Sequence, residues 1–135
     1  MKELIIEALT ENLSEVIAFV DEQLEAADCP VKSRMQIDIA VEEIFVNIAN
    51  YAYGDNVGIV MIRSKVSAEP YSFKITFIDN GVSYDPLSKP DPDVTLSAED
   101  RQIGGLGIYM VKKNMDSIDY QYLEGQNILT LTKRW

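Results

Sequence analysis

The hydrophobic period of the chain changes at Gly54, and this change restricts the folds that the sequence can adopt. Before Gly54, apolar residues recur at helical spacing, which predicts one helix ending near Ala27 and a second running from about Val31 to Gly54. After Gly54, residues 57–66 are rich in β-branched side chains, and residues 71–79 alternate between apolar and polar as half-buried strands do. The sequence therefore predicts a helical first part followed by a strand-rich part.

Shorter stretches complete this pattern. Residues 2–9 are an apolar run typical of an edge strand, and Thr10 or Asn12 can cap the first helix, with Glu15 completing a capping box after Asn12. Residues 118–123 and 128–133 predict a closing hairpin with its turn at 124–127. Helices grouped early and strands in adjacent pairs indicate an α+β fold, a two-layer sandwich with a mostly antiparallel mixed sheet and helices on one face. We expect a single domain over residues 1–135.

The composition excludes several classes of function. The chain has 12 Lys and Arg against 22 Asp and Glu, and its formal net charge of -10 argues against direct binding of nucleic acid. That charge suits a basic protein partner, and it equally suits simple solubility. The absence of histidine excludes histidine–metal sites, Ser-His-Asp hydrolysis and phosphohistidine formation within this chain. Cys29, the single cysteine, precedes Pro30, so we expect an inert residue and neither a disulfide nor a thiolate zinc site.

The compartment is predicted from the absence of targeting signals in the sequence. The first residues, MKELIIEALTENL, are too short a stretch and too acidic for a signal peptide. No apolar run reaches the length that crosses a bilayer. We therefore expect a cytoplasmic protein with no membrane partner.

The helix over residues 41–53, VEEIFVNIANYAY, carries two stripes. The first is apolar and predicts packing on a core, with five members at helical spacing: Ile37, Val41, Ile44, Ile48 and Ala52. The second holds Glu43, Asn47 and Asn50. A carboxylate one turn before a carboxamide can supply a proton acceptor and a neutral metal ligand in one line. The alternative is a solvated helix face, and Asn50 either supports the other two or is polar surface.

Asp79 lies in phase with the bulky residues of the strand over 71–79, so it faces the apolar layer. A carboxylate in that position needs a partner to offset its desolvation. An amino group on a flat apolar ligand would supply one, and Asn80-Gly81 lets the backbone turn close beside such a ligand. Two alternatives stay open: Asp79-Asn80-Gly81 is a plain turn, or the carboxylate caps a neighbouring backbone amide.

A glycine-rich stretch over residues 103–113, IGGLGIYMVKK, predicts a helix opened by Gly104, Gly105 and Gly107. Exposed amides at such a helix start favour phosphate groups. The stretch is neither a P-loop nor a dinucleotide fingerprint, and a hinge is the alternative. The expected core side of this helix consists of Ile108, Val111 and Met115.

Residues 82–103 show no periodicity and contain several prolines and acids. A structureless stretch longer than about 15 residues in a compact domain is a lid, a binding loop or a disordered insert. We expect a lid.

These stretches fall in the order acid–amide helix, strand-end Asp-x-Gly, long loop and glycine-opened helix. That layout resembles the GHKL family of Bergerat-type ATP-binding proteins, which includes gyrase, heat-shock chaperones, histidine kinases and mismatch-repair ATPases. Three motifs carry the resemblance: Glu43-x-x-x-Asn47, Asp79-x-Gly81 and Gly105-x-Gly107. Within the family, EEIFVNIANYAY, IDNGVSYDP and GGLGIYMVKKNMD are most similar to bacterial anti-sigma-factor serine/threonine kinases. The resemblance covers roughly residues 10–133.

The resemblance implies a role for the residues on the helix and at the strand end. Glu43 would be the general base, and Asn47 would hold the Mg²⁺ that bridges the phosphates. Asp79 would accept a hydrogen bond from the adenine amino group, with Gly81 leaving room for the ring.

The resemblance also implies roles later in the chain. Gly105 and Gly107 would let backbone amides meet the phosphates, and residues 82–103 would form the ATP lid. Thr130 lies on a closing strand where related folds place an adenine-side hydroxyl. The candidates for a basic residue at the phosphates, each of which is otherwise a solvated surface charge, are Arg101, Lys112 and Lys113.

The resemblance implies ATP and Mg²⁺ as cofactors, and an ATP-dependent serine/threonine protein kinase that acts as an anti-sigma regulatory factor in partner switching. The implied partners are a sigma factor and a small antagonist protein, and a homodimer is a family expectation. The alternative is a nucleotide-binding regulatory module without kinase activity. Retention of both Glu43 and Asn47 favours the enzyme, because a pure binder has no need of a base. The catalytic part of a histidine kinase is a third interpretation, with the phosphoacceptor on a separate protein.

Overall fold

The computed structural model describes residues 1–88 and 105–135 of the chain. Strands and helices follow in the order that the sequence predicts, and their bounds are β1 Lys2–Glu7, α1 Leu13–Ala26, α2 Val31–Asn47, β2 Ile59–Ser67, β3 Ser72–Asp79, α3 Gly105–Asn114, β4 Ser117–Leu123 and β5 Gln126–Arg134. Short helical turns lie at Thr10–Asn12 and Pro86–Ser88, and a π-helical turn at Ile48–Ala52 continues α2.

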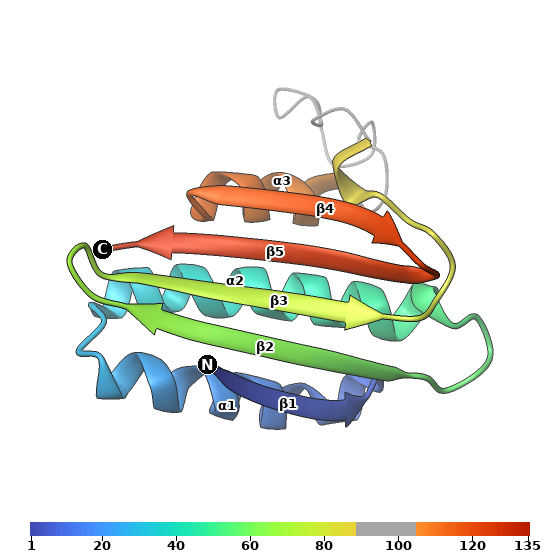
Figure 1. The fold of residues 1–135 in the computed structure, drawn as a ribbon, viewed down its shortest axis with the longest axis horizontal. Coiled ribbons are helices and arrows are strands. Elements are labelled where there is room, and N and C mark those ends of the chain that lie inside the picture. Colours follow the sequence, from blue (N-terminus) through green and yellow to red (C-terminus); the bar gives the residue numbers. More distant parts are fainter. Residues whose placement is uncertain (89–104) are drawn as a thin grey trace.

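The strands form one sheet in the order β1-β2-β3-β5-β4, which leaves β1 at an edge as predicted. α1, α2 and α3 lie on the same face of this sheet, with α2 between the other two (Figure 1). The predicted α+β sandwich is thereby confirmed. Each strand pair in the described part of the chain is antiparallel, so the parallel pairing of a mixed sheet does not occur there. Among the described helices, none is both long and apolar enough to cross a membrane.

Strand alternation builds the core between the sheet and the helices. On β3, Ile75 and Phe77 are buried, and Asp79 continues the same face with 4% of its surface exposed. β5 pairs with β3 so that Leu129 stands opposite Phe77 and Asn127 stands opposite Asp79. The apolar core therefore ends in a buried polar pair, Asp79 and Asn127, at the end of β3.

The central helix α2 buries the apolar stripe that the sequence predicts. All five members of that stripe are buried: Ile37, Val41, Ile44, Ile48 and Ala52. Gly54 follows with φ of 61°, a left-handed conformation that ends a helix and that glycine adopts without strain. The helix thus stops where the sequence predicts, and its partly buried polar stripe carries Glu43 and Asn47.

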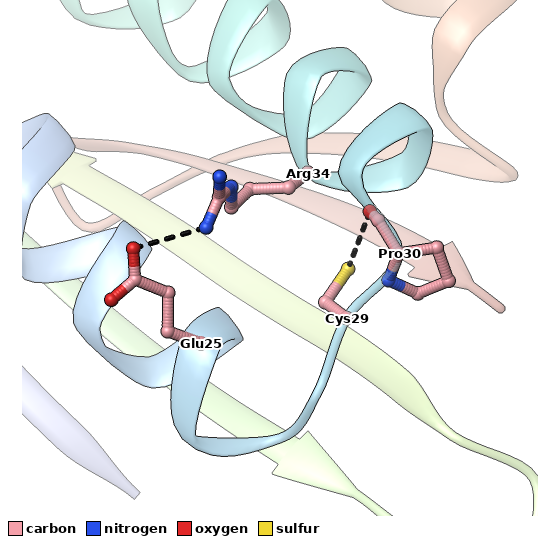
Figure 2. Close-up of polar contacts among 4 residues, drawn as sticks. All are labelled: Glu25, Cys29, Pro30 and Arg34. Carbon is pink, nitrogen blue, oxygen red and sulfur yellow. Dashed lines mark hydrogen bonds and ion pairs between the residues drawn. The ribbon is translucent and has the colours of Figure 1, made fainter.

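α1 and α2 are joined by a short connection that contains Cys29. Figure 2 shows its polar contacts: Arg34 Nη1 lies 3.0 Å from Glu25 Oε1, and the Cys29 thiol lies 3.6 Å from the Pro30 carbonyl oxygen. Burial raises the pKa of the Cys29 thiol, so this group is protonated at neutral pH. A protonated thiol is a poor nucleophile, which agrees with the prediction of an inert Cys29.

The predicted capping box at the start of α1 is wrong. Asn12 ends the helical turn Thr10–Asn12, and its φ of -90° and ψ of 1° differ from the extended conformation that is usual at an N-cap. Its side chain makes no hydrogen bond to an amide of the helix. Asn12 Nδ2 instead donates a hydrogen bond to the Glu7 carbonyl oxygen at 3.0 Å. The side chain therefore ties the end of β1 to the start of α1.

Candidate functional site

The acid–amide stripe of α2 meets the first turn of α3. Asn47 Nδ2 donates a hydrogen bond to Glu43 Oε1 at 3.2 Å. Gly107 lies so close that a methyl group there would overlap the Glu43 carboxylate. Two of the three predicted stretches, separated by the whole of β2 and β3 in sequence, therefore come together.

α3 begins at Gly105, so the predicted glycine-opened helix is present. Its predicted core residues, Ile108, Val111 and Met115, are buried. This packing fixes the helix against α2 and leaves its first turn, with the unpaired amides of a helix start, beside Glu43. A helix start with that geometry favours an anionic group.

Asp79 has partners within the described chain. Its Oδ1 accepts hydrogen bonds from the Gly81 amide and from Asn127 Nδ2, each at 2.9 Å. The cap on a backbone amide, one of the alternatives above, is therefore real. No described residue donates to Asp79 Oδ2, so one oxygen of this carboxylate stays available as an acceptor.

Gly81 approaches the protein's own backbone. A side chain at Gly81 would overlap the carbonyl of Ala52, and the next amide, that of Val82, donates to the Ala52 oxygen at 2.9 Å. The close approach that the sequence predicts thus has Ala52 as its neighbour. Room for a ligand ring at Gly81 stays a prediction.

A pocket joins the amide of α2 to the end of β3. Its empty volume is about 480 Å³ including the part open to solvent, and it has the mixed lining of small-molecule sites, apolar with a few polar groups. Asn47 and Asp79 both line it, whereas Glu43 touches it only through its hydrogen bond with Asn47. The full lining is Ile44, Asn47, Ile48, Tyr51, Ala52, Phe77, Asp79, Val82, Tyr84, Pro86, Ile108, Tyr120, Asn127 and Leu129.

Two residues at the end of β3 were not predicted from the sequence, and one of them, Asn127, lines the pocket. Asn127 is 6% exposed and in phase with the buried Leu129, and this phase was the signal that could have found it. The Tyr53 hydroxyl donates to the Ile59 carbonyl at 2.6 Å and accepts from the Asn80 amide at 2.9 Å. Burial raises the pKa of Tyr53, and the contact with the Asn80 amide opposes that rise.

Other predicted residues lie away from the pocket. Thr130 is on the helix-free face of the sheet, where its hydroxyl lies 3.1 Å from that of Thr76, so the prediction of an adenine-side hydroxyl is wrong. Asn50 is exposed, on the outer surface of the π-helical turn. Lys112 and Lys113 are in the last turn of α3, about 10 Å of helix beyond Gly105.

Three predictions fall outside the described residues. Arg101 and Gly104 lie there, as does most of the predicted lid over residues 82–103, of which residues 82–88 are described.

A metal ion at this site would have few protein ligands. Among residues 1–88 and 105–135, no group of three or more acidic, cysteine or histidine residues could hold a metal. Asn47 uses its amide nitrogen on Glu43, which leaves its carbonyl oxygen for a cation. Mg²⁺ commonly takes one or two protein oxygens and completes its shell with water and substrate phosphates, so the residues present fit it.

The chain is similar to several known proteins. A family model described as a histidine kinase-like ATPase domain matches residues 6–133. The serine/threonine-protein kinase BtrW of Bordetella bronchiseptica is 30% identical over 101 residues, which cover 73% of this chain and 69% of BtrW. The serine-protein kinase RsbW of Bacillus cereus is 34% identical over 95 residues, which cover 67% of this chain and 58% of RsbW.

Among solved structures, the RsbU and RsbW domains of a Mycobacterium tuberculosis protein share the fold. Their TM-score is 0.66 at 16% identity, over 99% of this chain and 32% of that chain. Of the two kinases above, RsbW of Bacillus cereus is matched over less than two thirds of its own length.

Proposed function

The chain belongs to the histidine kinase-like ATPase family, and we propose that it is an ATP-dependent serine/threonine protein kinase that acts as an anti-sigma regulatory factor. The observation that carries the proposal is the contact between Glu43, Asn47 and the first turn of α3 at Gly107, beside a pocket that Asn47 shares with Asp79. In this proposal Glu43 supplies the acid, Asn47 the amide that would bind a metal, and the start of α3 the amides that would bind phosphates, while Asp79 would bind the adenine base in the same pocket as Asn47.

In this proposal the pocket holds the nucleotide with its base at Asp79 and its phosphates at α3. Asp79 Oδ2 accepts from the adenine amino group, while apolar side chains such as Phe77 and Leu129 exclude water around the ring. The amides at Gly105 and Gly107 bind the phosphates. Mg²⁺ bound at the Asn47 carbonyl oxygen would neutralise charge on the phosphates. Positioning and electrostatic stabilisation of the transferred phosphoryl group would supply most of the catalysis.

Glu43 has the role of general base. The hydroxyl oxygen of an acceptor serine or threonine bonds to the γ-phosphorus, its proton passes to the Glu43 carboxylate, and ADP departs with the electrons of the broken bond. The Asn47 amide holds Oε1 of that carboxylate, so the other oxygen is left for the proton. The names of BtrW and RsbW as kinases support phosphoryl transfer as the reaction.

The partners follow from the same relationship. We propose a sigma factor and a small antagonist protein as binding partners, with the antagonist as phosphoacceptor. The formal net charge of -10 suits a partner with a basic surface. A homodimer, a cytoplasmic location and a single domain over residues 1–135 remain proposals of the same kind.

The alternative is a nucleotide-binding regulatory module that holds a partner and transfers nothing. One observation favours it: Glu43 is not among the residues that line the pocket, although Asn47 and Asp79 are. A chain that only binds would need those two residues and no base.

The experiment measures transfer from radiolabelled ATP, with Mg²⁺, to the proteins that co-purify with the chain from its native host. The wild type should label one small partner, and Glu43→Gln should label it about 10²–10⁴-fold more slowly. Glu42→Gln is the matched control, because Glu42 is the exposed neighbour on the same helix, and it should transfer as the wild type does. Transfer by Glu43→Gln at the wild-type rate would refute the base, and ATP binding without any transfer by the wild type would establish the alternative.

A further inference from the structure

We propose that Asn127 is a positioning residue that orients the Asp79 carboxylate toward the nucleotide base and ties it to residues 81–84, so that base recognition and the position of this segment depend on one side chain. The inference rests on the proposed function, since it concerns the same pocket. It assigns a role to a residue that none of the three motifs contains.

The hydrogen bonds of Asn127 carry the inference. Its Nδ2 donates to Asp79 Oδ1 and to the Val82 carbonyl oxygen, both at 2.9 Å, with the Gly81 carbonyl oxygen at 3.5 Å. Its Oδ1 accepts from the Tyr84 amide at 3.1 Å and from the Tyr120 hydroxyl. The side chain is buried, and its contact with Asp79 is buried as well, whereas its contacts with Val82, Tyr84 and Tyr120 are partly buried.

The pattern requires a carboxamide. The two donated hydrogen bonds at 2.9 Å and the two accepted ones already use the full capacity of an asparagine side chain, because its NH₂ group has two hydrogens and its oxygen two lone pairs. A carboxylate in its place could not donate, and a hydroxyl could donate only once. The pattern also fixes which end of the amide faces Asp79, since only the nitrogen can serve that oxygen.

The first consequence concerns Asp79. Its Oδ1 is held by two donors, the Gly81 amide and Asn127 Nδ2, so rotating the carboxylate would break both bonds. Oδ2 is thereby presented to the pocket in one orientation. A fixed acceptor discriminates between an amino group and a carbonyl on the ligand, because a carbonyl there would leave a buried carboxylate oxygen unpaired.

The second consequence concerns the segment 81–84. Val82 is held by its amide on Ala52 and by its carbonyl on Asn127, and the Tyr84 amide is held by the same side chain. The chain that leaves β3 is therefore anchored through the residue that orients Asp79. A displacement of Asp79 or of residues 81–84 therefore displaces the other, because the amide of Asn127 contacts both.

The test replaces the amide with a carboxylate of the same shape. Asn127→Asp removes both donated hydrogens and places an acid beside Asp79, so adenosine affinity should fall roughly tenfold or more at pH 8. At pH 5.5 much of the affinity should return, because two adjacent carboxyls share a proton and the introduced carboxyl, once protonated, can donate again. Besides Asp79, the titratable side chain that contacts Asn127 is Tyr120, through its hydroxyl, whereas Tyr84 contacts Asn127 through its backbone amide.

Two further variants separate this role from a general defect. Gln126→Glu makes the same amide-to-acid change one residue away, where the side chain contacts Asn80 Oδ1 at 3.1 Å, and should keep wild-type affinity at both pH values. Tyr120→Phe removes one donor to Asn127 Oδ1 and should lower the affinity for adenosine by no more than about threefold.

Amide hydrogen exchange without nucleotide reads the anchor directly. Exchange at Val82 and Tyr84 should accelerate in Asn127→Ala, while the Asn56 amide, bonded to the Tyr53 carbonyl at 3.1 Å, should exchange as in the wild type. Wild-type affinity of Asn127→Asp at pH 8, a loss that low pH does not recover, or unchanged exchange at Val82 and Tyr84 in Asn127→Ala would each overturn the inference. Failure of the wild type to bind adenosine would instead refute the proposed function, and the exchange measurement does not depend on it.

Discussion

The site has two ends that are built in different ways, and the pocket reaches one at Asn47 and the other at Asp79. At the helix end, Glu43, Asn47 and Gly107 are joined by one hydrogen bond and one close approach between helices. At the strand end, Asp79 and Asn127 belong to a network that also takes in the backbone of residues 81–84. At the helix end, no described residue donates to the second Glu43 oxygen or to the Asn47 carbonyl oxygen, whereas the strand end leaves one oxygen of Asp79 without such a donor.

This difference assigns different tasks to the two ends. A closed network presents one rigid acceptor, which suits recognition of a base whose shape does not change during a reaction. Open oxygens beside a helix start suit phosphates and a proton that move as the reaction proceeds. Substitutions at the helix end should therefore affect transfer first, and substitutions at the strand end should affect binding first.

Gly107→Ala would break the helix end and should have the largest effect. The added methyl overlaps the Glu43 carboxylate, so Glu43 must move or α3 must shift. A displacement of about 1 Å at a reacting group can cost 10²-fold in rate, and we expect a loss of at least that size in transfer to the cognate acceptor. Adenosine binding, measured by calorimetry, should change by less than about threefold, because the strand end is untouched.

Met110→Ala is the control for that variant, since Met110 is an exposed side chain on the same helix. It should transfer and bind as the wild type does. Equal losses of transfer and adenosine affinity in Gly107→Ala would mean that the two ends are not separable.

Asp38 lies outside both ends of the site, so Asp38→Asn should have the smallest effect of these variants and should change stability alone. Asp38 of α2 lies near Asp21 of α1, and each has a buried oxygen without a donor among the described residues. Burial, a hydrogen bond with Asp21 and repulsion from that carboxylate raise the pKa of Asp38 to about 7, while Arg34 opposes the rise. The folded chain therefore binds more protons than the unfolded chain between about pH 4 and pH 7, and the free energy of unfolding falls as pH rises through this window.

The variant should remove most of that pH dependence. At pH 8 the thermal midpoint of Asp38→Asn should lie about 2–4 °C above that of the wild type, a modest shift because Asp38 is only partly buried. Asp119→Asn, at an exposed position of β4, should leave the midpoint unchanged. If the thermal midpoint of Asp38→Asn depended on pH as steeply as that of the wild type, this account would be contradicted. A change in nucleotide affinity would also contradict it.

The sequence could predict features that depend on the spacing of apolar residues along a helix or strand. It could not predict features that depend on which residues pair between two strands. Helical spacing predicted the buried stripe of α2, and alternation on β3 predicted that Asp79 faces inward. The hairpin was different, because its turn was expected over residues 124–127. Its turn consists of Glu124 and Gly125, whose φ values of 52° and 78° match a tight two-residue connection.

That shorter turn extends β5 back to Gln126 and brings Asn127 into the strand, on the inner face. Because side chains alternate along a strand, Thr130 then points to the other face. The error on Thr130 and the omission of Asn127 thus share one cause. The approach of Gly107 to Glu43 could not be predicted by either period, since it depends on how α3 packs against α2.

The measurement that tests the central claim most directly is a calorimetric titration of ATP with Mg²⁺ into the wild type, Asp79→Asn and Glu43→Gln. Asp79→Asn should lose roughly tenfold or more in affinity, because a carboxamide can present an amino group to the adenine amine, and Oδ2 is the Asp79 oxygen to which no described residue donates. Glu43→Gln should bind within about twofold of the wild type, since a base acts on the acceptor hydroxyl and not on the nucleotide. Wild-type affinity in Asp79→Asn, or equal losses in the two variants, would contradict the assignment of base recognition to the strand end and of chemistry to the helix end.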